Sequence, residues 1–300
     1  MSDLAGPGSL HNDDEAALKN SAARLSIFAA AFLIVLKTAT GWLTGSISVW
    51  ASLLDSGMDI FASTINFFAV RAATRPPDED HTYGHGKAES LAGLFQALVI
   101  TVSAVFLIWE GIRRLLAPRP TDSEIIGIGT MITAMLVSFA LVARLRYVAR
   151  ITESPALRAD AMHYASDIYS NAGALCALLL VWLTNWQLAD PLFSIAISLY
   201  ILRSAIGVGH ESIDVLMDRR LPPMIDEQVA TVVKRFAPHG VVGFHDLRTR
   251  RSGSHKFIDL HLEVERQQSL EEAHALTVRV LRAIEAEIPR ARVQIHTDPV

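Results

Sequence analysis

The sequence predicts an α-helical membrane protein with six transmembrane helices, followed by a small C-terminal α+β domain. The composition supports the membrane part, because 51% of the 300 residues are hydrophobic and the mean hydropathy is +0.30. Soluble domains are usually less apolar than this. The apolar residues are gathered into long runs, and a helix needs roughly 20 such residues to cross a bilayer. Beyond Arg203 these runs give way to shorter amphipathic patterns.

Six apolar runs are expected to form the transmembrane helices. The fifth of them carries a polar extension at its N-terminal end. The runs cover residues 25–42, 47–70, 92–108, 125–142, 172–186 and 192–208.

The distribution of basic residues favours both termini in the cytoplasm. The first and third outer turns hold no Lys or Arg, although the loop between the third and fourth runs holds three arginines. The polar and acidic start of the chain has no signal-peptide pattern. It is expected to be disordered. The inner loops carry Arg71, Arg75, Lys87, Arg144, Arg146, Arg150 and Arg158.

The end of the chain has the patterns of a separate small domain. Helical spacing covers residues 226–236 and 271–288, and strand patterns cover residues 241–250, 256–265 and 291–298. The order helix, strand, strand, helix, strand predicts an α+β domain. The expected organisation is a disordered tail (1–22), a transmembrane domain (23–208), a linker (209–220) and a cytoplasmic metal-binding domain (221–300).

Two aspartates stand inside the second apolar run. Asp55 and Asp59 are four residues apart, so their carboxylates lie on one face of a helix. A carboxylate at the bilayer centre costs roughly 2.5 to 3.5 kcal/mol on insertion scales. A pair on one face therefore indicates a cation site, against the alternative of a protonated aspartate bonded between helices.

The fifth run begins with a second pair at the same spacing. His163 and Asp167 place an imidazole and a carboxylate on one helix face. His163 alone would be explained equally well as an interfacial histidine, but the repeated spacing favours a ligand. If the two helices face each other, three carboxylates and one imidazole can surround a tetrahedral Zn²⁺ ion.

The charges of these four side chains suggest how transport is coupled. Three ionised carboxylates would repel one another in a low dielectric, so the empty site is expected to hold protons. Metal binding requires deprotonated ligands and would release those protons. The sequence therefore predicts an antiporter that carries metal one way and protons the other.

Two further clusters lie outside the apolar runs. In the first inner loop, Asp78, His81 and His85 are compatible with a cation site or, equally, with a solvated acidic loop. In the C-terminal domain the strand patterns point Asp259, His261 and Glu263 away from the core, and the last strand does the same for His296 and Asp298. If the strands are neighbours, metal ligands would gather on one face, drawn from His245, His261, His274, His296 and Asp298.

Other classes of function are less compatible with the sequence. A formal net charge of −4 excludes a strongly basic nucleic-acid binder. The single cysteine, Cys176, excludes a cysteine-based zinc site. An intramembrane metalloprotease would need His-Glu-x-x-His, and His210-Glu211 has no second histidine four residues on. A metal sensor would explain the tail but not ligands inside the membrane, so a transporter rather than an enzyme is expected.

Five segments together resemble the cation diffusion facilitator family, from about residue 23 to residue 299. They begin at Leu54, His81, His163, His245 and Ile295 and read LDSGMD, HTYGHGKAE, HYASD, HDLRTR and IHTDP. Each segment alone is short, whereas the combination is specific. The chain departs from the family pattern at Thr297, where a longer polar side chain is expected.

The resemblance implies a homodimer in the bacterial inner membrane that exports a divalent cation, with a ferredoxin-like or metallochaperone-like cytoplasmic domain. It implies a binuclear tail site in which Asp298 bridges the metals, and tail metals that stabilise the dimer and influence transport. It also implies an interlock between Lys87 and a carboxylate after the sixth helix, for which Asp218 is the candidate. The implied transport ligands are Asp55, Asp59, His163 and Asp167, and the loop ligands are Asp78, His81 and His85.

Zn²⁺ is the expected ion, both as cargo and as regulatory metal. The imidazole among the intramembrane ligands favours Zn²⁺ or Cd²⁺ over an ion that prefers only oxygen, such as Mn²⁺. Fe²⁺, Mn²⁺ and Co²⁺ stay open as cargo, because affinity alone does not decide among these ions.

Overall fold

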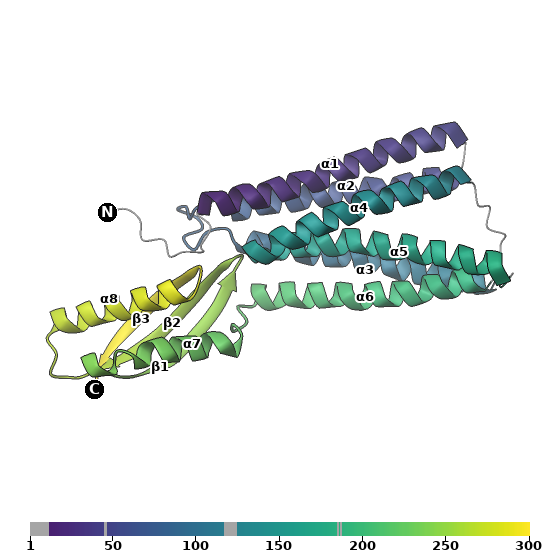
Figure 1. The fold of residues 1–300 in the computed structure, drawn as a ribbon. Coiled ribbons are helices and arrows are strands. Elements are labelled where there is room, and N and C mark those ends of the chain that lie inside the picture. Colours follow the sequence, from purple (N-terminus) through teal and green to yellow (C-terminus); the bar gives the residue numbers. More distant parts are fainter. Residues whose placement is uncertain (1–11, 45–46, 117–124, 185, 187) are drawn as a thin grey trace. The chain divides into compact units, whose positions relative to one another are not determined.

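The computed structural model describes residues 12–44, 47–116, 125–184, 186 and 188–300, without the side chains at 12, 41, 43–44, 47–55, 125–128 and 178. The described chain divides into two compact units, residues 13–213 and residues 214–300. The first unit is helical, and Figure 1 shows its long helices lying side by side. They are α1 (Asn12–Thr44), α2 (Ile47–Ala73), α3 (Lys87–Leu116), α4 (Ile125–Thr152), α5 (Pro155–Thr184) and α6 (Ala189–Leu216).

Five of these helices are long and apolar enough to cross a membrane. Their candidate spans are Asp13–Thr40, Lys87–Leu116, Gly129–Thr152, Pro155–Thr184 and Ala189–Leu216. Among the described residues α2 is also a long helix, and its role as the sixth span stays a prediction. The helical membrane domain expected from the apolar runs is therefore confirmed.

The expected disorder of residues 1–22 is wrong for the part that the structure describes, because α1 begins at Asn12. Buried ion pairs stabilise the helical turns of α1 that precede residue 23. The Lys19 ammonium lies 2.9 Å from Glu15 Oε1 and 3.0 Å from Glu89 Oε1, and Ser154 donates a hydrogen bond to the same Glu89 carboxylate. The charges of Glu15 and Lys19 are thus satisfied inside the bundle rather than by water.

The sixth helix also extends further than the apolar run suggests. The linker is expected to begin at residue 209, whereas α6 continues to Leu216. An ion pair on the surface stabilises the polar C-terminal end of α6, where Arg158 Nη1 of α5 lies 2.6 Å from Glu211 Oε1. The N-terminal half of α6 packs closely against α5 at Gly173. A Cβ atom at this glycine would lie only 1.8 Å from Ile197 Cδ1 of α6, so there is no space for a larger residue.

The second unit is a three-stranded sheet with two helices on one face. Its sheet order is β1-β2-β3, with β1 antiparallel and β3 parallel to β2. Apolar residues of α7, α8 and the strands form one core, which includes Val232, Leu260 and Val280. A capping box between Ser269 and Glu272 begins α8. The elements are α7 (Pro223–Lys234), a short 3₁₀ turn (Ala237–His239), β1 (Val241–Ser252), β2 (His255–Val264), α8 (Leu270–Glu287) and β3 (Ala291–Pro299).

Candidate metal sites

Three of the four intramembrane ligands predicted from the spacing meet inside the helical bundle. Ligand atoms of Asp59 on α2 and of His163 and Asp167 on α5 all lie within 4.8 Å of one another. His163 Nε2 is 3.0 Å from Asp59 Oδ1, and the two side chains are 6% and 9% exposed. Asp55 lies on α2 one turn before Asp59, but its side chain is outside the described residues, so its place in the site stays a prediction.

Hydrogen bonds beside this group fix α5 against α1 and α2. The Tyr164 hydroxyl is 2.8 Å from Ser63 Oγ on α2 and donates a hydrogen bond of 3.2 Å to the backbone oxygen of Ser26 on α1. Ser26 Oγ donates in turn to Asp160 Oδ2 at 2.6 Å. Since Tyr164 follows His163 directly, these bonds hold the imidazole in place.

Sequence reasoning missed two ionisable residues near this group. Asp160 is fully buried one helical turn before His163, and it precedes the fifth apolar run, residues 172–186. Lys37 stands in the middle of the first apolar run, and its ammonium donates a hydrogen bond of 2.6 Å to Ser56 Oγ on α2. A charged residue within an apolar run is itself a signal of function.

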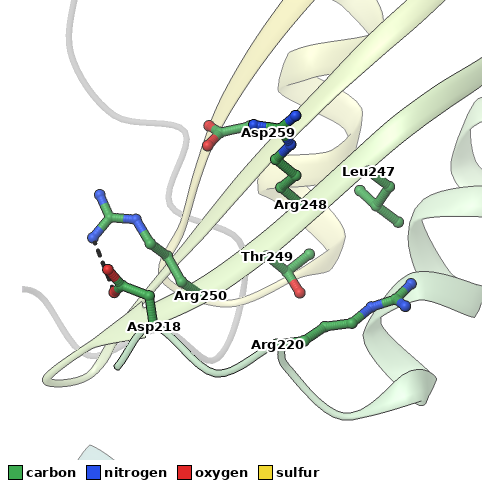
Figure 2. A pocket seen from close by; sticks show the side chains of 7 residues that line it. All are labelled: Asp218, Arg220, Leu247, Arg248, Thr249, Arg250 and Asp259. Atoms are coloured by element: carbon green, nitrogen blue, oxygen red, sulfur yellow. Dashed lines mark ion pairs between the residues drawn. The ribbon is translucent and has the colours of Figure 1, made fainter. Parts of the chain in front are cut away.

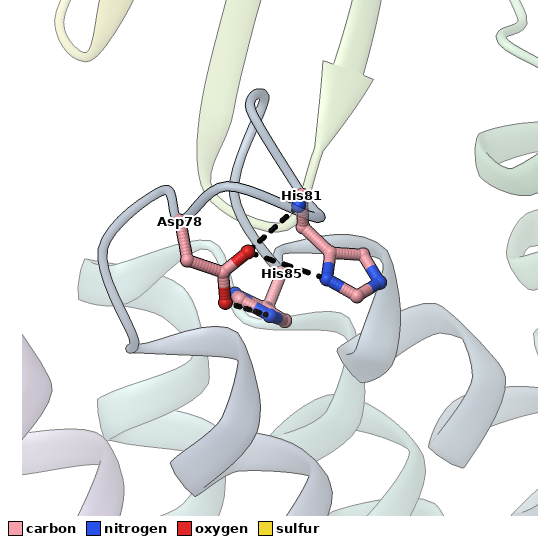
Figure 3. A group of neighbouring side chains, drawn as sticks. All are labelled: Asp78, His81 and His85. Atoms are coloured by element: carbon pink, nitrogen blue, oxygen red, sulfur yellow. Dashed lines mark hydrogen bonds and ion pairs between the residues drawn. The ribbon is translucent and has the colours of Figure 1, made fainter.

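The structure brings the three predicted loop residues together, as Figure 3 shows. Asp78 Oδ2 lies 3.2 Å from His85 Nε2, Asp78 Oδ1 lies 3.4 Å from His81 Nδ1, and the two imidazole centroids are 4.5 Å apart. The backbone N–H of His81 donates to Asp78, which lowers the pKa of that carboxyl below its usual value. An ionised carboxylate thus faces two imidazoles in the loop.

The strand pairing gathers most of the predicted tail ligands on the sheet face opposite the helices. His261 on β2 is paired with His245 on β1 and with His296 on β3. The centroid of the His261 ring lies 5.1 Å from that of the His245 ring and 4.7 Å from that of the His296 ring. The condition on which the tail cluster depends, that the strands are neighbours, is therefore met.

The carboxylate of Asp298 lies between these histidines. Its Oδ2 is 2.9 Å from His261 Nδ1 and 3.5 Å from His245 Nε2, whereas its Oδ1 is 3.3 Å from His296 Nε2. The hydrogen bond with His261 lowers the pKa of the Asp298 carboxyl, and the nearby imidazoles act in the same direction. Because its two oxygens face different histidines, this carboxylate has the arrangement that bridging two cations requires.

The prediction that His274 shares this face is wrong for a single chain. His274 is exposed on α8, which packs through Leu276 and Val280 against the other face of the sheet. Thr297 also points to the helix side, where its hydroxyl is 2.8 Å from that of Thr277. The departure from the family pattern at Thr297 therefore leaves the side chains of the histidine face in place.

A β-bulge adds one carboxylate that the sequence pattern could not reveal. The register shifts between His245 and Arg248, and Asp246 has a φ of +49°. As a result the ligand atoms of His245, Asp246 and His261 lie within 4.8 Å of one another. Strict alternation would send Asp246 to the opposite face from His245, but bulges re-aim side chains.

The two proposed interlock residues lie in different units, so their pairing stays a prediction. Within the cytoplasmic unit, Asp218 Oδ1 is 3.5 Å from Arg250 Nη1, and the guanidinium of Arg250 lies 4.5 Å from the centre of the Phe257 ring. Figure 2 shows this ion pair beside a cavity of about 410 Å³. Leu221 N donates to Thr249 Oγ1 close by, so the segment after α6 is tied to β1 twice.

Comparison with known proteins agrees with this architecture. A family model described as the cation efflux transmembrane domain matches residues 23–217, and one described as the cation efflux protein cytoplasmic domain matches residues 221–300. The cation-efflux pump FieF of Yersinia pestis (strain Pestoides F) is 46% identical over 279 residues, which cover 93% of this chain and 92% of that relative. FieF of Yersinia pseudotuberculosis serotype I (strain IP32953) is similar to the same extent.

Among solved structures, the zinc form of CzrB, a candidate zinc transporter, is 33% identical over 27% of this chain and 92% of that one. Its TM-score of 0.26 is too low to support a comparison of folds. The family match rests instead on the transmembrane model, which covers more than half of the chain, and on the FieF relatives. The chain therefore belongs to the cation efflux family, also called cation diffusion facilitators, and is a multi-spanning membrane transporter rather than an enzyme.

Proposed function

We propose that the protein exports Zn²⁺ from the cytoplasm in exchange for protons. The observation that carries this proposal is the group of buried Asp59 and His163 with half-buried Asp167, held between two long helices of a cation efflux protein. Asp55, one turn before Asp59, is the fourth proposed ligand. Two oxygen donors, an imidazole and one further carboxylate suit tetrahedral Zn²⁺. Cd²⁺ and Fe²⁺ are the alternative cargoes, because the imidazole accepts these ions as well.

Proton coupling is supported by the charges of the same group. The side chains of Asp59 and His163 are almost wholly buried, and water cannot neutralise carboxylates there as it does at a surface. When the divalent ion leaves, its charge must be replaced, and protons are the cations that carboxylates and an imidazole accept most directly. Exchange of metal for protons avoids leaving unpaired charges within the membrane.

The remaining clusters are proposed as resident metal sites. The loop residues Asp78, His81 and His85 offer one carboxylate and two imidazoles, and the tail face offers His245, His261, His296 and Asp298. Both donor sets fit Zn²⁺. The exposed tail side chains are in contact with the solvent, which suits a site that responds to the cytoplasmic metal concentration.

We further propose a homodimer with both termini in the cytoplasm, in the inner membrane of a bacterium. The Yersinia relatives and the match to the cytoplasmic domain model support this assignment. His274 does not join the histidine face of its own chain, so a role as ligand would require a second copy. Lys87 and Asp218 are proposed as the interlock between the membrane and cytoplasmic domains.

Purified protein in sealed vesicles tests the transport proposal. Zn²⁺ uptake is expected to be fast with an imposed pH gradient and slow without it, and proton movement should accompany metal in the opposite direction. Asp59→Asn should abolish both fluxes. Asp190→Asn is the matched control, since it makes the same change at an ion pair with Arg114 away from the metal group. Metal flux that ignores the pH gradient would refute proton coupling while leaving metal export intact.

A further inference from the structure

One positive charge lies inside the membrane domain next to the transport group. Lys37 belongs to the candidate span Asp13–Thr40 of α1 and is half-buried. Its Nζ donates a hydrogen bond of 2.6 Å to Ser56 Oγ, and Ser56 is fully buried on α2. An ammonium group within a span is costly unless it has a counter-charge or a function.

The helix geometry of α2 links this ammonium to the metal ligands. Ser56 and Asp59 are three residues apart, so they share a face and are separated by roughly 4.5 Å along the helix axis. Both are buried, which shows that this face points into the bundle. The positive charge of Lys37 therefore lies about one turn from the group formed by Asp59, His163 and Asp167.

Lys37 balances the formal charges of the three proposed aspartate ligands and their cargo, whereas Asp160, buried one turn before His163, is hydrogen-bonded to Ser26 and is counted apart from this set. The proposed ligands Asp55, Asp59 and Asp167 carry three negative charges, and a divalent cation supplies two positive charges. The ammonium supplies the third. Without Lys37 the loaded site would keep one uncompensated negative charge in a low-dielectric environment, and such a charge would hold the metal ion more tightly.

We propose that Lys37 is the fixed counter-charge of the transport site, which makes the loaded site neutral and weakens metal binding enough for release. This inference rests on the proposed function of the site. Lys37 is a positioning residue in this account, because it acts through the ligands and does not coordinate the ion.

The transport test compares Lys37→Met, which removes the charge and keeps the length of the side chain, with Lys37→Arg, which keeps the charge. Zn²⁺ uptake into vesicles is measured at pH 8, where competition from protons is weakest. Lys37→Met should lower both KM and kcat by about tenfold, because binding tightens and release slows. Lys37→Arg should retain both values within about threefold. Arg203→Met, which removes a cation from α6, is the control and should match the wild type.

A binding measurement separates this inference from the transport proposal. Full-length protein carrying His85→Ala and His261→Ala keeps the intramembrane group while the loop and tail clusters are broken. Competition with a chelating indicator should show that Lys37→Met tightens Zn²⁺ binding about tenfold in this background. An unchanged or weaker affinity overturns the role of Lys37, even where wild-type transport is proton-driven. Tighter binding without any wild-type flux supports the counter-charge and refutes the transport function.

Discussion

The intramembrane group and the histidine face of the cytoplasmic domain use the same residue types in opposite surroundings. In the membrane domain, His163 and Asp59 are 6% and 9% exposed. In the cytoplasmic domain, His245 and His296 are 46% and 67% exposed. Asp59 and His163 of the first group are almost closed off from solvent, whereas His245 and His296 of the second are exposed to it.

This difference decides what each group can do. A buried carboxylate must be neutralised by a metal ion, a proton or a fixed cation, so a change of occupant is forced to be an exchange. A carboxylate that keeps contact with solvent, such as the half-buried Asp298, is stabilised by water and by its histidines, so metal can leave without a replacement. The buried group is therefore suited to coupled transport, and the exposed face is suited to sensing the metal concentration.

The largest expected effect is the loss of transport on removing a ligand from the buried group. Asp59→Asn should lower Zn²⁺ flux at least about 100-fold, because ligands matter more than the outer-shell groups whose loss costs 10- to 100-fold. Asp298→Asn, the same change on the exposed face, should alter flux only about fivefold, as expected of coupling between separate sites. Vesicle uptake rates at saturating Zn²⁺ give the comparison. Equal losses in the two variants would remove the distinction between the groups.

Replacing the buried imidazole should change which ion is carried. His163→Asp gives an all-oxygen donor set, which favours harder cations such as Mn²⁺ over Zn²⁺. The ratio of Zn²⁺ to Mn²⁺ flux should fall about tenfold or more. Parallel uptake assays with each ion measure this ratio. If the ratio keeps its wild-type value, His163 does not touch the cargo.

The exposed face should lose metal without losing transport when its shared histidine is removed. His261 belongs to both ligand groups of this face, so His261→Ala should weaken tail binding about 10- to 100-fold. His274→Ala should do so only at protein concentrations where two copies associate, because His274 lies on the other side of its own sheet. Metal titrations over a range of protein concentrations separate the two cases. A concentration-independent effect of His274→Ala would contradict the placement described above.

The smallest expected effect concerns the stability of the metal-free protein at acidic pH. The hydrogen bond with His261 lowers the pKa of Asp298 from its usual 3.8. A lowered pKa means that the ionised carboxyl stabilises the fold above the usual value and loses this effect as the pH falls through the folded value. The difference in Tm between wild type and Asp298→Asn should therefore be constant from pH 7 to pH 5 and shrink only in stronger acid. Thermal unfolding of metal-free protein checks this, and a difference that vanishes already at pH 6 would assign it to the histidines.

The sequence predicts the parts of these sites that follow from regular periodicity. The four-residue spacing predicts that Asp55 shares a helix face with Asp59, and His163 with Asp167. Strand alternation predicts that His261 on one strand, and His296 and Asp298 on another, point away from the core. Apolar runs predicted the membrane helices, although their ends depend on tertiary ion pairs such as Lys19 with Glu89.

Features that depend on irregular or long-range geometry could not be predicted in the same way. The bulge that turns Asp246 toward the histidines has no marker in the strand pattern. The side of the sheet that α8 covers decides the position of His274, and helical spacing alone does not fix it. The contact of Lys37 with Ser56 joins residues 19 apart on two helices, although a lysine within an apolar run is visible from the sequence itself.

The most direct test of the central claim is to locate the metal ion in the membrane domain. Anomalous scattering at the zinc edge, from crystals of the full-length protein with Zn²⁺, would show where the ion binds. We expect a peak about 2.0 to 2.2 Å from His163 Nε2 and from carboxylate oxygens of Asp59 and Asp167. Peaks confined to the loop and the histidine face, with none between α2 and α5, would contradict the assignment of the buried group as the transport site.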